Sequence, residues 1–304
     1  MGVKMHDGQL EIGEADVRGL LAEQFPAWRE MPVRRVHGVG TVNAIFRIGD
    51  GYAARFPLER ADAPEMERTL VREMAALEEL ATVSTVPSPV PVSIGAPGHG
   101  YPLPWAVQTW ISGEVATPDA TAHSRALAHD LVELIAALRS ADMRGRAFSG
   151  EGRGGRLQDS DEWMATCFAE SEGMLPVPEL RVMWSRLRTL PDAPGLAMTH
   201  GDLIPANLLL DEGRLCGLLD GGGFGPADPS LDLVVAWHLL DADACEVMRD
   251  GLRCGELEWR RGAAWAFQQA MGLVWYYARS NPTMSMLGRS TLRRLLDDEE
   301  ISAS

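Results

Sequence analysis

Positive charge is scarce in this sequence, and lysine is nearly absent. Lys4 is the single lysine in 304 residues, and 28 basic residues stand against 43 acidic ones, for a formal net charge of −15. Binding to nucleic acid or to an anionic membrane requires a concentrated basic face, so we expect neither as a partner. An acidic surface attracts cations, which favours a cationic small molecule, although solubility alone would also explain the charge.

Long apolar runs and cysteine motifs are missing as well. No run approaches the roughly 20 apolar residues of a membrane-spanning helix, and the N-terminal stretch MGVKMHDGQLEIGEAD lacks the apolar core of a signal peptide. The four cysteines form neither a CxxC pair nor an even framework, which is typical of buried thiols in a reducing compartment. We therefore expect a cytoplasmic protein.

The sequence changes character near its first third. Short β-rich pieces (VRRVH, TVNAIFRIG, GYAARFPL) separated by turns such as GDG, with one helix from about Pro64 to Ala81, predict an antiparallel sheet. Beyond the expected linker SGEVATPD, apolar residues recur at helical spacing, first over Ala120 to Ser140. The predicted class is α+β. A small β-sheet N-terminal lobe (residues 1–110, hinge at about 108–113) would precede a larger, mainly helical C-terminal lobe (residues 111–304).

The stretch THGDLIPANLLLDEGRLCGLLDGGG, residues 199–223, interrupts these helices and carries three oxygen-bearing side chains. Asp202 follows a predicted strand, Asn207 begins the next, and Asp220 ends the strand that pairs with it through the DEGR hairpin. Because a hairpin brings its ends together, we expect the three side chains to lie close. Such a group suits Mg²⁺, together with a carboxylate that orients an attacking hydroxyl. Each residue alone would be an ordinary turn cap.

The motif HGDLIPANLLL…GLLDGGG resembles the catalytic and metal-binding segments of the aminoglycoside/macrolide phosphotransferase family, small-molecule relatives of protein kinases. GPADPSLDLVVAW is similar to the segment that follows in that family. TVNAIFRIGDGYAARFPL and WYYARSNP extend the resemblance over most of the chain. The resemblance implies a protein-kinase-like bilobal fold, Mg²⁺ as cofactor, and ATP or GTP as phosphoryl donor.

The resemblance also implies roles for individual residues of the second lobe. Asp202 would be the catalytic base, with Asn207 and Asp220 as Mg²⁺ ligands. His200 would be a structural brace, and Asp232 a buried residue that bonds the catalytic-loop backbone. Three glycines follow Asp220 where a bulky residue is frequent, which suggests a mobile turn beside the metal.

The nucleotide side requires a cation on the third strand to hold the phosphates. With lysine absent there, Arg55 in YAARFPL takes this place, and Glu73 on the following helix is its expected ion-pair partner. The loop GVGTVN is predicted to lie over the triphosphate, and the backbone of the hinge to meet the purine. The other nucleotide-binding candidates are Thr41, Asn43, Trp110 and Ile111. The literal GxGxxG motif GEGRGG at residues 150–155 follows no strand, so we interpret it as a flexible loop.

The acceptor is expected to bind the helical lobe. Asp241 and Asp243 begin a helix, and Trp275 and Tyr276 lie near a helix end, so these four are the acceptor candidates. Helix capping and core packing are the competing interpretations. His238, on an apolar helix, is predicted to be a hydrogen-bonded core histidine.

These observations together predict an enzyme. It would transfer the γ-phosphoryl group of a nucleoside triphosphate to a hydroxyl of an antibiotic-like small molecule, of aminoglycoside, macrolide or nucleoside type, and confer resistance. A kinase of amino alcohols or sugars is the alternative within the class. A non-catalytic nucleotide-binding pseudokinase and a metallohydrolase built on His200, Asp202 and Asp220 are the alternatives outside it.

Overall fold

The computed structural model describes residues 9–36 and 42–302. The chain divides into two compact units. The first comprises Met1–Thr82, Pro87–Ser112 and Asp220–Gly222, and the second comprises Val83–Val86, Gly113–Leu219 and Gly223–Ser304.

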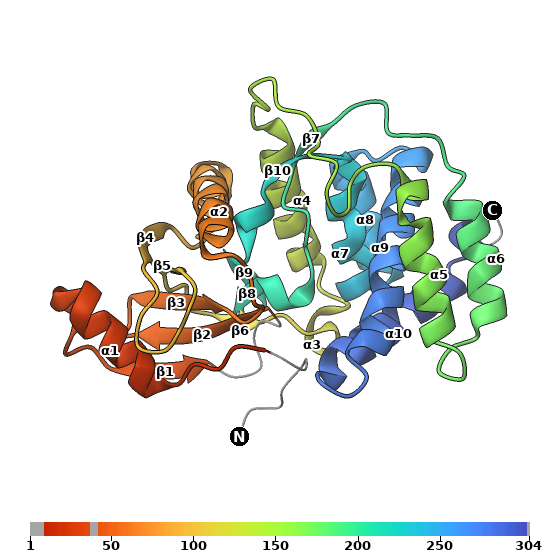
Figure 1. Ribbon diagram of the computed structural model, residues 1–304. Helices are drawn as coiled ribbons and strands as arrows, with labels where there is room; N and C mark the ends of the chain where they lie inside the picture. Colours follow the sequence, from red (N-terminus) through yellow and green to blue (C-terminus); the bar gives the residue numbers. More distant parts are fainter. Residues whose placement is uncertain (1–8, 37–41, 303–304) are drawn as a thin grey trace. The chain divides into compact units, whose positions relative to one another are not determined.

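The first unit is built on a five-stranded antiparallel sheet with strand order β1-β2-β3-β5-β4 (Figure 1). Its elements are α1 (Glu14–Gln24), a 3-10 turn (Pro26–Trp28), β1 (Val33–Val36), β2 (Asn43–Ile48), β3 (Tyr52–Pro57), α2 (Ala63–Val83), β4 (Pro91–Gly95) and β5 (Trp105–Thr109). Every second residue of β2 is buried, the alternation expected of a strand with one face on the core.

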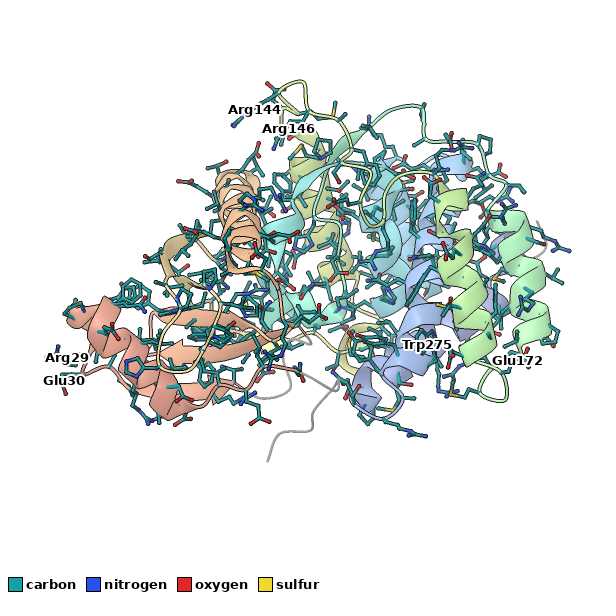
Figure 2. All side chains as sticks on the ribbon, in the orientation of Figure 1. Arg29, Glu30, Arg144, Arg146, Glu172 and Trp275 are labelled. Atoms are coloured by element: carbon teal, nitrogen blue, oxygen red, sulfur yellow. The ribbon has the colours of Figure 1, made fainter. Side chains whose placement is uncertain are left out.

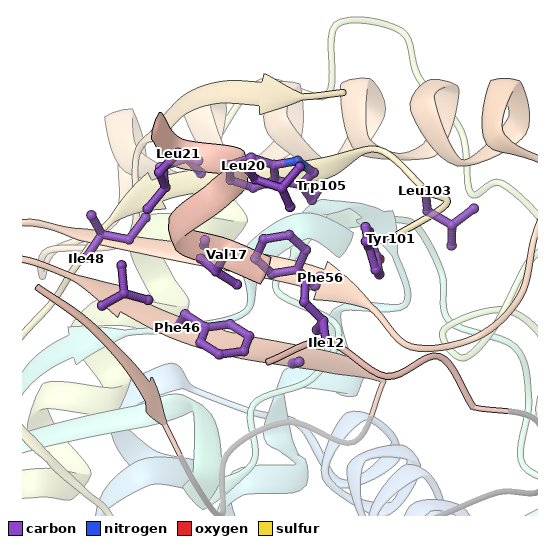
Figure 3. Packing of buried hydrophobic residues seen from close by; sticks show 14 of the residues in the cluster. Ile12, Val17, Leu20, Leu21, Phe46, Ile48, Phe56, Tyr101, Leu103 and Trp105 are labelled. Carbon is purple, nitrogen blue, oxygen red and sulfur yellow. The ribbon is translucent and has the colours of Figure 1, made fainter. Parts of the chain in front are cut away.

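Aromatic side chains fill the core of the first unit between α1 and the sheet (Figure 3). Phe56 stacks on Trp105 with ring centroids 4.7 Å apart and meets Phe46 edge-on at 5.7 Å. All three rings are fully buried. A Cβ on Gly95 would lie 2.1 Å from the Trp105 ring, so only glycine leaves room for this indole. Large aromatic areas therefore anchor the sheet that carries Arg55.

The second unit is mainly helical and contains two small antiparallel sheets, β6-β8-β9 and β7-β10. Its elements are β6 (Glu114–Val115), α3 (Pro118–Thr121), α4 (Arg125–Ser140), α5 (Asp161–Glu170), α6 (Val177–Leu187), β7 (Ala197–Thr199), β8 (Leu208–Asp211), β9 (Arg214–Leu218), β10 (Gly225–Ala227), α7 (Val234–Leu239), α8 (Ala242–Leu252), α9 (Glu256–Tyr276), α10 (Pro282–Asp297) and α11 (Glu299–Ser302). Helix α9 is buried along most of its length and contacts α5, α6, α7 and α10.

The antiparallel sheet followed by helices confirms the predicted α+β class. Two local predictions were wrong. The expected linker SGEVATPD contains β6, because Glu114 and Val115 pair with β8. The helix expected from Ala120 begins at Arg125, because the Ser124 side chain accepts the Leu127 N–H (3.1 Å) and caps it there. Within the described residues, none of the helices is long and apolar enough to cross a membrane.

A chain of polar side chains crosses the otherwise apolar core formed by α7, α9 and α10. The imidazole of His238 is fully buried, with Nδ1 2.8 Å from Thr291 Oγ1 and Nε2 3.0 Å from Gln269 Oε1. His238 is thus a hydrogen-bonded core histidine, as predicted. Burial lowers the pKa of His238 to about 4, because its charged form loses hydration there, although the hydrogen bond to the Gln269 oxygen opposes this shift.

The depressed pKa of His238 predicts acid-sensitive stability. A histidine whose pKa is lowered in the folded state makes its full contribution to the unfolding free energy above its ordinary pKa of 6.5. This contribution is lost as pH falls toward 4. At about 1.4 kcal/mol per pKa unit, the loss approaches roughly 3 kcal/mol. His238→Gln should therefore show a flatter decline of the unfolding free energy between pH 7 and pH 4.5, measured by chemical denaturation. The exposed His129→Gln is the control and should decline like the parent; equal slopes for all three proteins would refute the argument.

Candidate active site

The loop after β7 is held by a buried carboxylate. Asp232 is fully buried, and its two oxygens accept the backbone N–H groups of His200 (2.8 Å) and Gly201 (2.9 Å). Burial raises the pKa of Asp232, while the two backbone hydrogen bonds oppose the shift. Gly201 has φ +83°, a left-handed conformation that glycine adopts without strain. Asp232 therefore fixes the backbone of the loop just before Asp202.

His200 connects this loop to the end of the β8–β9 hairpin. Its Nε2 lies 2.9 Å from the carbonyl oxygen of Leu219, which can only accept, so Nε2 carries the proton. Its Nδ1 then accepts the backbone N–H of Asp202 at 3.3 Å. The N–H of Leu219 donates to the carbonyl of Asn207 at 2.8 Å. One neutral imidazole, 1% exposed, thus ties the loop to the residue that precedes Asp220 in the chain.

Three donors hold the carboxylate of Asp202. Oδ1 accepts from Arg153 at 2.6 Å and from Gln269 Nε2 at 2.7 Å, while Oδ2 accepts from Asn207 Nδ2 at 3.1 Å. A carboxylate has about four acceptor positions. Among the described contacts of Asp202, the position left over lies on Oδ2, and the side chain is 35% exposed. Oδ2 can therefore accept a hydrogen bond from a hydroxyl of a bound molecule.

Asn207 presents its amide oxygen as a potential metal ligand. The residue ends the 3-10 turn Pro205–Asn207 just before β8, and its Nδ2 donates to Asp202 at both the backbone oxygen (2.9 Å) and Oδ2 (3.1 Å). Both amide hydrogens are thus directed at Asp202, and no donor in the described part of the chain bonds the amide oxygen. A hard oxygen donor of this kind is what Mg²⁺ prefers.

In the first unit, Arg55 on β3 pairs with Asp220. Arg55 Nη2 lies 2.6 Å from Asp220 Oδ1, and their side chains are 15% and 47% exposed. Burial alone lowers the pKa of Arg55, but the charge and hydrogen bond of Asp220 outweigh it and raise the pKa. Glu73, the partner expected from the sequence, adds a smaller charge effect, and the described ion pair of Arg55 is with Asp220 instead. Burial raises the pKa of Glu73, and Arg55 opposes that shift.

The first two glycines after Asp220, Gly221 and Gly222, serve close packing. Asp220 itself has φ +58°, a conformation that non-glycine residues rarely adopt. A Cβ on Gly221 would lie 2.0 Å from Leu80 Cδ2, and one on Gly222 would lie 3.2 Å from Glu73 Cβ. The mobile turn suggested by the sequence is therefore not needed to explain these glycines, because α2 packs directly on their backbone.

The remaining nucleotide-side candidates lie in the first unit or outside the described residues. Asn43 is the first residue of β2 and is half-buried. Trp110 donates its backbone N–H to Gly51 (2.8 Å) and carries the guanidinium of Arg47 over its ring at 5.1 Å. Ile111 follows and is half-buried. Thr41 and the rest of the GVGT stretch fall outside the described residues.

The acceptor-side candidates differ in how they are engaged. Asp241 caps α8, accepting the Ala244 N–H at 3.0 Å, and its other oxygen contacts His123. Asp243 is exposed in the first turn of the same helix. Trp275 and Tyr276 end α9 in an aromatic cluster, and the Tyr276 ring is 38% exposed (Figure 2 labels Trp275). The capping interpretation thus describes what Asp241 does in this structure.

Sequence reasoning missed two residues of the site, Arg153 and Gln269. Arg153 comes from the GEGRGG loop, whose C-terminal end is anchored because the Gly154 carbonyl accepts the Asp228 N–H at 2.8 Å. Gly154 has φ +103°, and a Cβ there would lie 2.6 Å from Ala227 Cβ. The available signals were an arginine inside a glycine-rich loop and a polar Gln-Gln pair inside the apolar helix AAWAFQQAMGLVW.

The Asp228 that anchors this loop belongs to a buried ion pair. Arg261 Nε and Nη2 lie 2.8 and 2.5 Å from Asp228 Oδ2, and both side chains are 2% exposed. Trp265 donates to the same oxygen at 2.9 Å, while the N–H and hydroxyl of Ser230 satisfy Oδ1. Arg261 also donates to the Gly155 carbonyl at 3.5 Å. The charges are fully paired, as burial requires.

A model of the phosphotransferase enzyme family matches residues 33–265. The chain belongs to this family. It is 36% identical over 77 residues to an aminoglycoside 3'-phosphotransferase of Escherichia coli, a match that spans 25% of this chain and only 27% of that protein. Solved structures extend the likeness over nearly the whole chain.

Two solved structures share the fold of this chain. The GDP and kanamycin complex of an APH(2'')-III enzyme has a TM-score of 0.68 at 18% identity, covering 91% of this chain and 98% of that one. The apoenzyme of a macrolide 2'-phosphotransferase from Brachybacterium faecium has a TM-score of 0.62 at 18% identity, covering 92% and 97%. The protein-kinase-like α+β class predicted from the sequence is thereby confirmed.

The close approach of Gly221 to α2 yields a stability prediction. Gly221→Ala should lower the unfolding free energy by about 1–3 kcal/mol, because the buried Leu80 must move to admit the methyl group. Gly223→Ala is the matched control, since its nearest atom would be the His200 carbonyl oxygen at 3.8 Å. Chemical denaturation of both variants decides the matter. Equal losses in the two would show that packing against Leu80 is not the constraint.

Proposed function

We propose that this protein is a nucleoside-triphosphate-dependent O-phosphotransferase that modifies a hydroxyl of an antibiotic-like small molecule. One observation carries the proposal: the Asp202 carboxylate of the HGDLIPAN motif is held by three donors, with an acceptor position remaining on Oδ2. The family to which the chain belongs supports the reaction class.

The proposed reaction needs one base and an in-line displacement. The acceptor hydroxyl donates to Asp202 Oδ2, which orients its oxygen toward the γ-phosphorus. As the new O–P bond forms, the bond from the γ-phosphorus to the β–γ bridging oxygen breaks and the nucleoside diphosphate leaves. The hydroxyl proton passes to Asp202. Because Arg153 and Gln269 already occupy Oδ1, the carboxylate accepts this proton in a defined orientation.

Asn207 and Asp220 are the proposed Mg²⁺ ligands. Both offer oxygen donors, and within the described residues no cluster of three His, Cys, Asp or Glu side chains forms a closed metal cage. That donor set fits Mg²⁺, which usually takes one or two protein oxygens and completes its shell with water and phosphates. When bound, Mg²⁺ would neutralise charge on the phosphates. The lack of a histidine cluster also disfavours the metallohydrolase alternative.

Arg55 is the proposed phosphate-binding cation. Arginine is always charged and its planar fork matches phosphate oxygens. The ion pair with Asp220 shows that the guanidinium is directed at an anionic group in this structure. The backbone around Trp110 and Ile111 would meet the purine of ATP or GTP, and Thr41 and Asn43 would lie near the phosphates. Residues 1–110 would thus be the nucleotide lobe and residues 111–304 the acceptor lobe.

The acceptor would be a hydroxylated antibiotic of aminoglycoside, macrolide or nucleoside type, and its phosphorylation would confer resistance in the cytoplasm. Aminoglycoside and macrolide phosphotransferases both share the fold, which supports either type. A cationic acceptor fits the net charge of −15. Asp243, Trp275 and Tyr276 are the proposed contacts, together with Asp241, although its carboxylate is engaged in capping. An amino-alcohol or sugar kinase would use the same base.

Screening identifies the acceptor and tests the proposed function. The parent protein is incubated with ATP or GTP, Mg²⁺ and a panel of antibiotics and amino alcohols, and products are detected by the mass gain of one phosphoryl group. The proposal is supported if a hydroxyl-bearing compound gains the mass of one phosphoryl group only when nucleoside triphosphate is present. Nucleotide binding without any phosphorylated acceptor favours the pseudokinase.

Asp202→Ala should lower kcat by roughly 10²–10⁴-fold, because the hydroxyl loses the group that orients it and takes its proton. Nucleotide affinity, measured by calorimetry, should stay near that of the parent. Asp211→Ala is the control, since this exposed carboxylate lies in the same segment at the end of β8. Near-parental kcat in Asp202→Ala would remove Asp202 from the role of base.

Arg55→Ala should weaken nucleoside triphosphate binding or lower kcat by misplacing the phosphates. Arg55→Lys should keep part of the function, because it retains the charge but loses the planar fork. Arg34→Ala, an exposed arginine on β1 of the same sheet, is the matched control. Calorimetric titration and steady-state kinetics measure both effects; if affinity and kcat of Arg55→Ala equal those of Arg34→Ala, another residue binds the phosphates.

A further inference from the structure

The buried polar chain of the helical core ends on the proposed catalytic base. Thr291 on α10 contacts His238 on α7 (2.8 Å), His238 contacts Gln269 on α9 (3.0 Å), and Gln269 contacts Asp202 Oδ1 (2.7 Å). His238 and Thr291 are fully buried and Gln269 is 7% exposed. The reaction proposed above assigns no task to His238 or Thr291, and polar groups of this kind are costly in an apolar core.

The carboxylate of Asp202 fixes the directions of the hydrogen bonds that Gln269 makes with Asp202 and with His238. An ionised carboxylate only accepts, so the Gln269 amide must direct its NH₂ group toward Asp202 and its oxygen toward His238. That oxygen also only accepts, so His238 must carry its proton on Nε2. Nδ1 is then unprotonated, and the single hydroxyl proton of Thr291 is shared between Nδ1 and the Leu287 carbonyl oxygen, which lies 2.9 Å from Thr291 Oγ1. Reversing the amide would place two acceptors against each other at Asp202 and two donors against each other at His238.

The neutral state of His238 agrees with this assignment. A doubly protonated imidazole would donate from both nitrogens, but burial lowers the pKa of His238 to about 4, so the ring is neutral near pH 7. The His238–Gln269 and Gln269–Asp202 bonds therefore both direct their donor hydrogens toward Asp202. Hydrogen bonds aligned in this way polarise one another and strengthen the last one in the row.

We propose that Gln269 is a positioning residue for Asp202, and that His238, itself in contact with Thr291, holds the Gln269 amide in the one orientation that donates to Oδ1. With Oδ1 bound from inside the helical core, the carboxylate cannot rotate, and Oδ2 is the oxygen that meets the acceptor hydroxyl. This inference rests on the proposed function of Asp202. It concerns orientation alone, and no proton moves along the chain.

The first test separates orientation from packing. Gln269→Leu keeps the size of the side chain but removes the donor to Oδ1. It should lower kcat by roughly 10- to 100-fold, the cost of misplacing a catalytic group, while KM for the nucleotide stays within about twofold of the parent. Gln268→Leu is the matched control, because Gln268 immediately precedes Gln269 on α9 and both residues are 7% exposed. Equal kcat for the two variants overturns the proposal.

Rescue by a conservative variant gives the second test. His238→Gln offers an amide N–H to the Gln269 oxygen, whereas His238→Leu offers none. The proposal expects His238→Gln to retain several-fold more of the parental kcat than His238→Leu, with both variants checked for folding by thermal denaturation. Equal kcat in two folded variants would contradict an orienting role for His238.

Nuclear magnetic resonance tests the geometry without any assay of activity. In the parent protein labelled with ¹⁵N-histidine, the imidazole signals of His238, assigned by their loss in His238→Gln, should be those of the neutral Nε2–H tautomer from pH 7 to pH 5.5. An Nδ1–H tautomer of His238, or a doubly protonated ring at neutral pH, overturns the proposed orientation of the Gln269 amide. A parent protein that shows the Nε2–H tautomer yet phosphorylates no acceptor would overturn the proposed function while leaving the amide orientation established.

Discussion

The buried ion pair of Asp228 and Arg261 is the constraint on which the helical unit depends. Two charges at 2% exposure would be strongly unfavourable alone, and they are stable here because every lone pair of Asp228 has a donor. The pair joins three segments. Asp228 and Arg261 bond the carbonyl groups of Gly154 and Gly155, respectively, in the loop that carries Arg153. Asp228 also lies at the start of the turn that carries Asp232, and Arg261 belongs to α9, which carries Gln269. Each of these segments reaches the Asp202 loop.

The consequence is a carboxylate whose orientation is decided by distant parts of the chain. Asp202 would otherwise be an exposed loop residue free to rotate, and a rotating base orients a hydroxyl poorly. Arg153 and Gln269 bind one oxygen, and Asn207 binds the other. Because Asn207 directs both amide hydrogens at Asp202, its own amide oxygen is left for the proposed metal ion. The same contacts thus leave one acceptor position on Asp202 and one oxygen of Asn207, which are the groups that the proposed phosphoryl transfer needs.

In the first unit, the backbone of Asp220 is strained. A left-handed conformation at a non-glycine residue costs on the order of 1–2 kcal/mol, and it persists where surrounding contacts impose it. Here the ion pair with Arg55 and the packing of Gly221 on Leu80 hold the turn on both sides. An arginine in this position also binds more than one oxygen, so Arg55 can hold Asp220 and still offer donors to a phosphate.

The sequence by itself determined the α+β class, the segment that carries Asp202, Asn207 and Asp220, and the strand that carries Arg55. These features are local: hydrophobic periodicity, turn residues and a contiguous motif depend on near neighbours in the chain. Only the tertiary structure decided that Arg153 and Gln269 bind Asp202, since they are 49 and 67 residues away and no local pattern specifies such a contact. It also decided that Asp241 caps a helix and that His238 contacts Gln269, because the partner of a buried polar group is set by how helices pack, not by the spacing of residues along them.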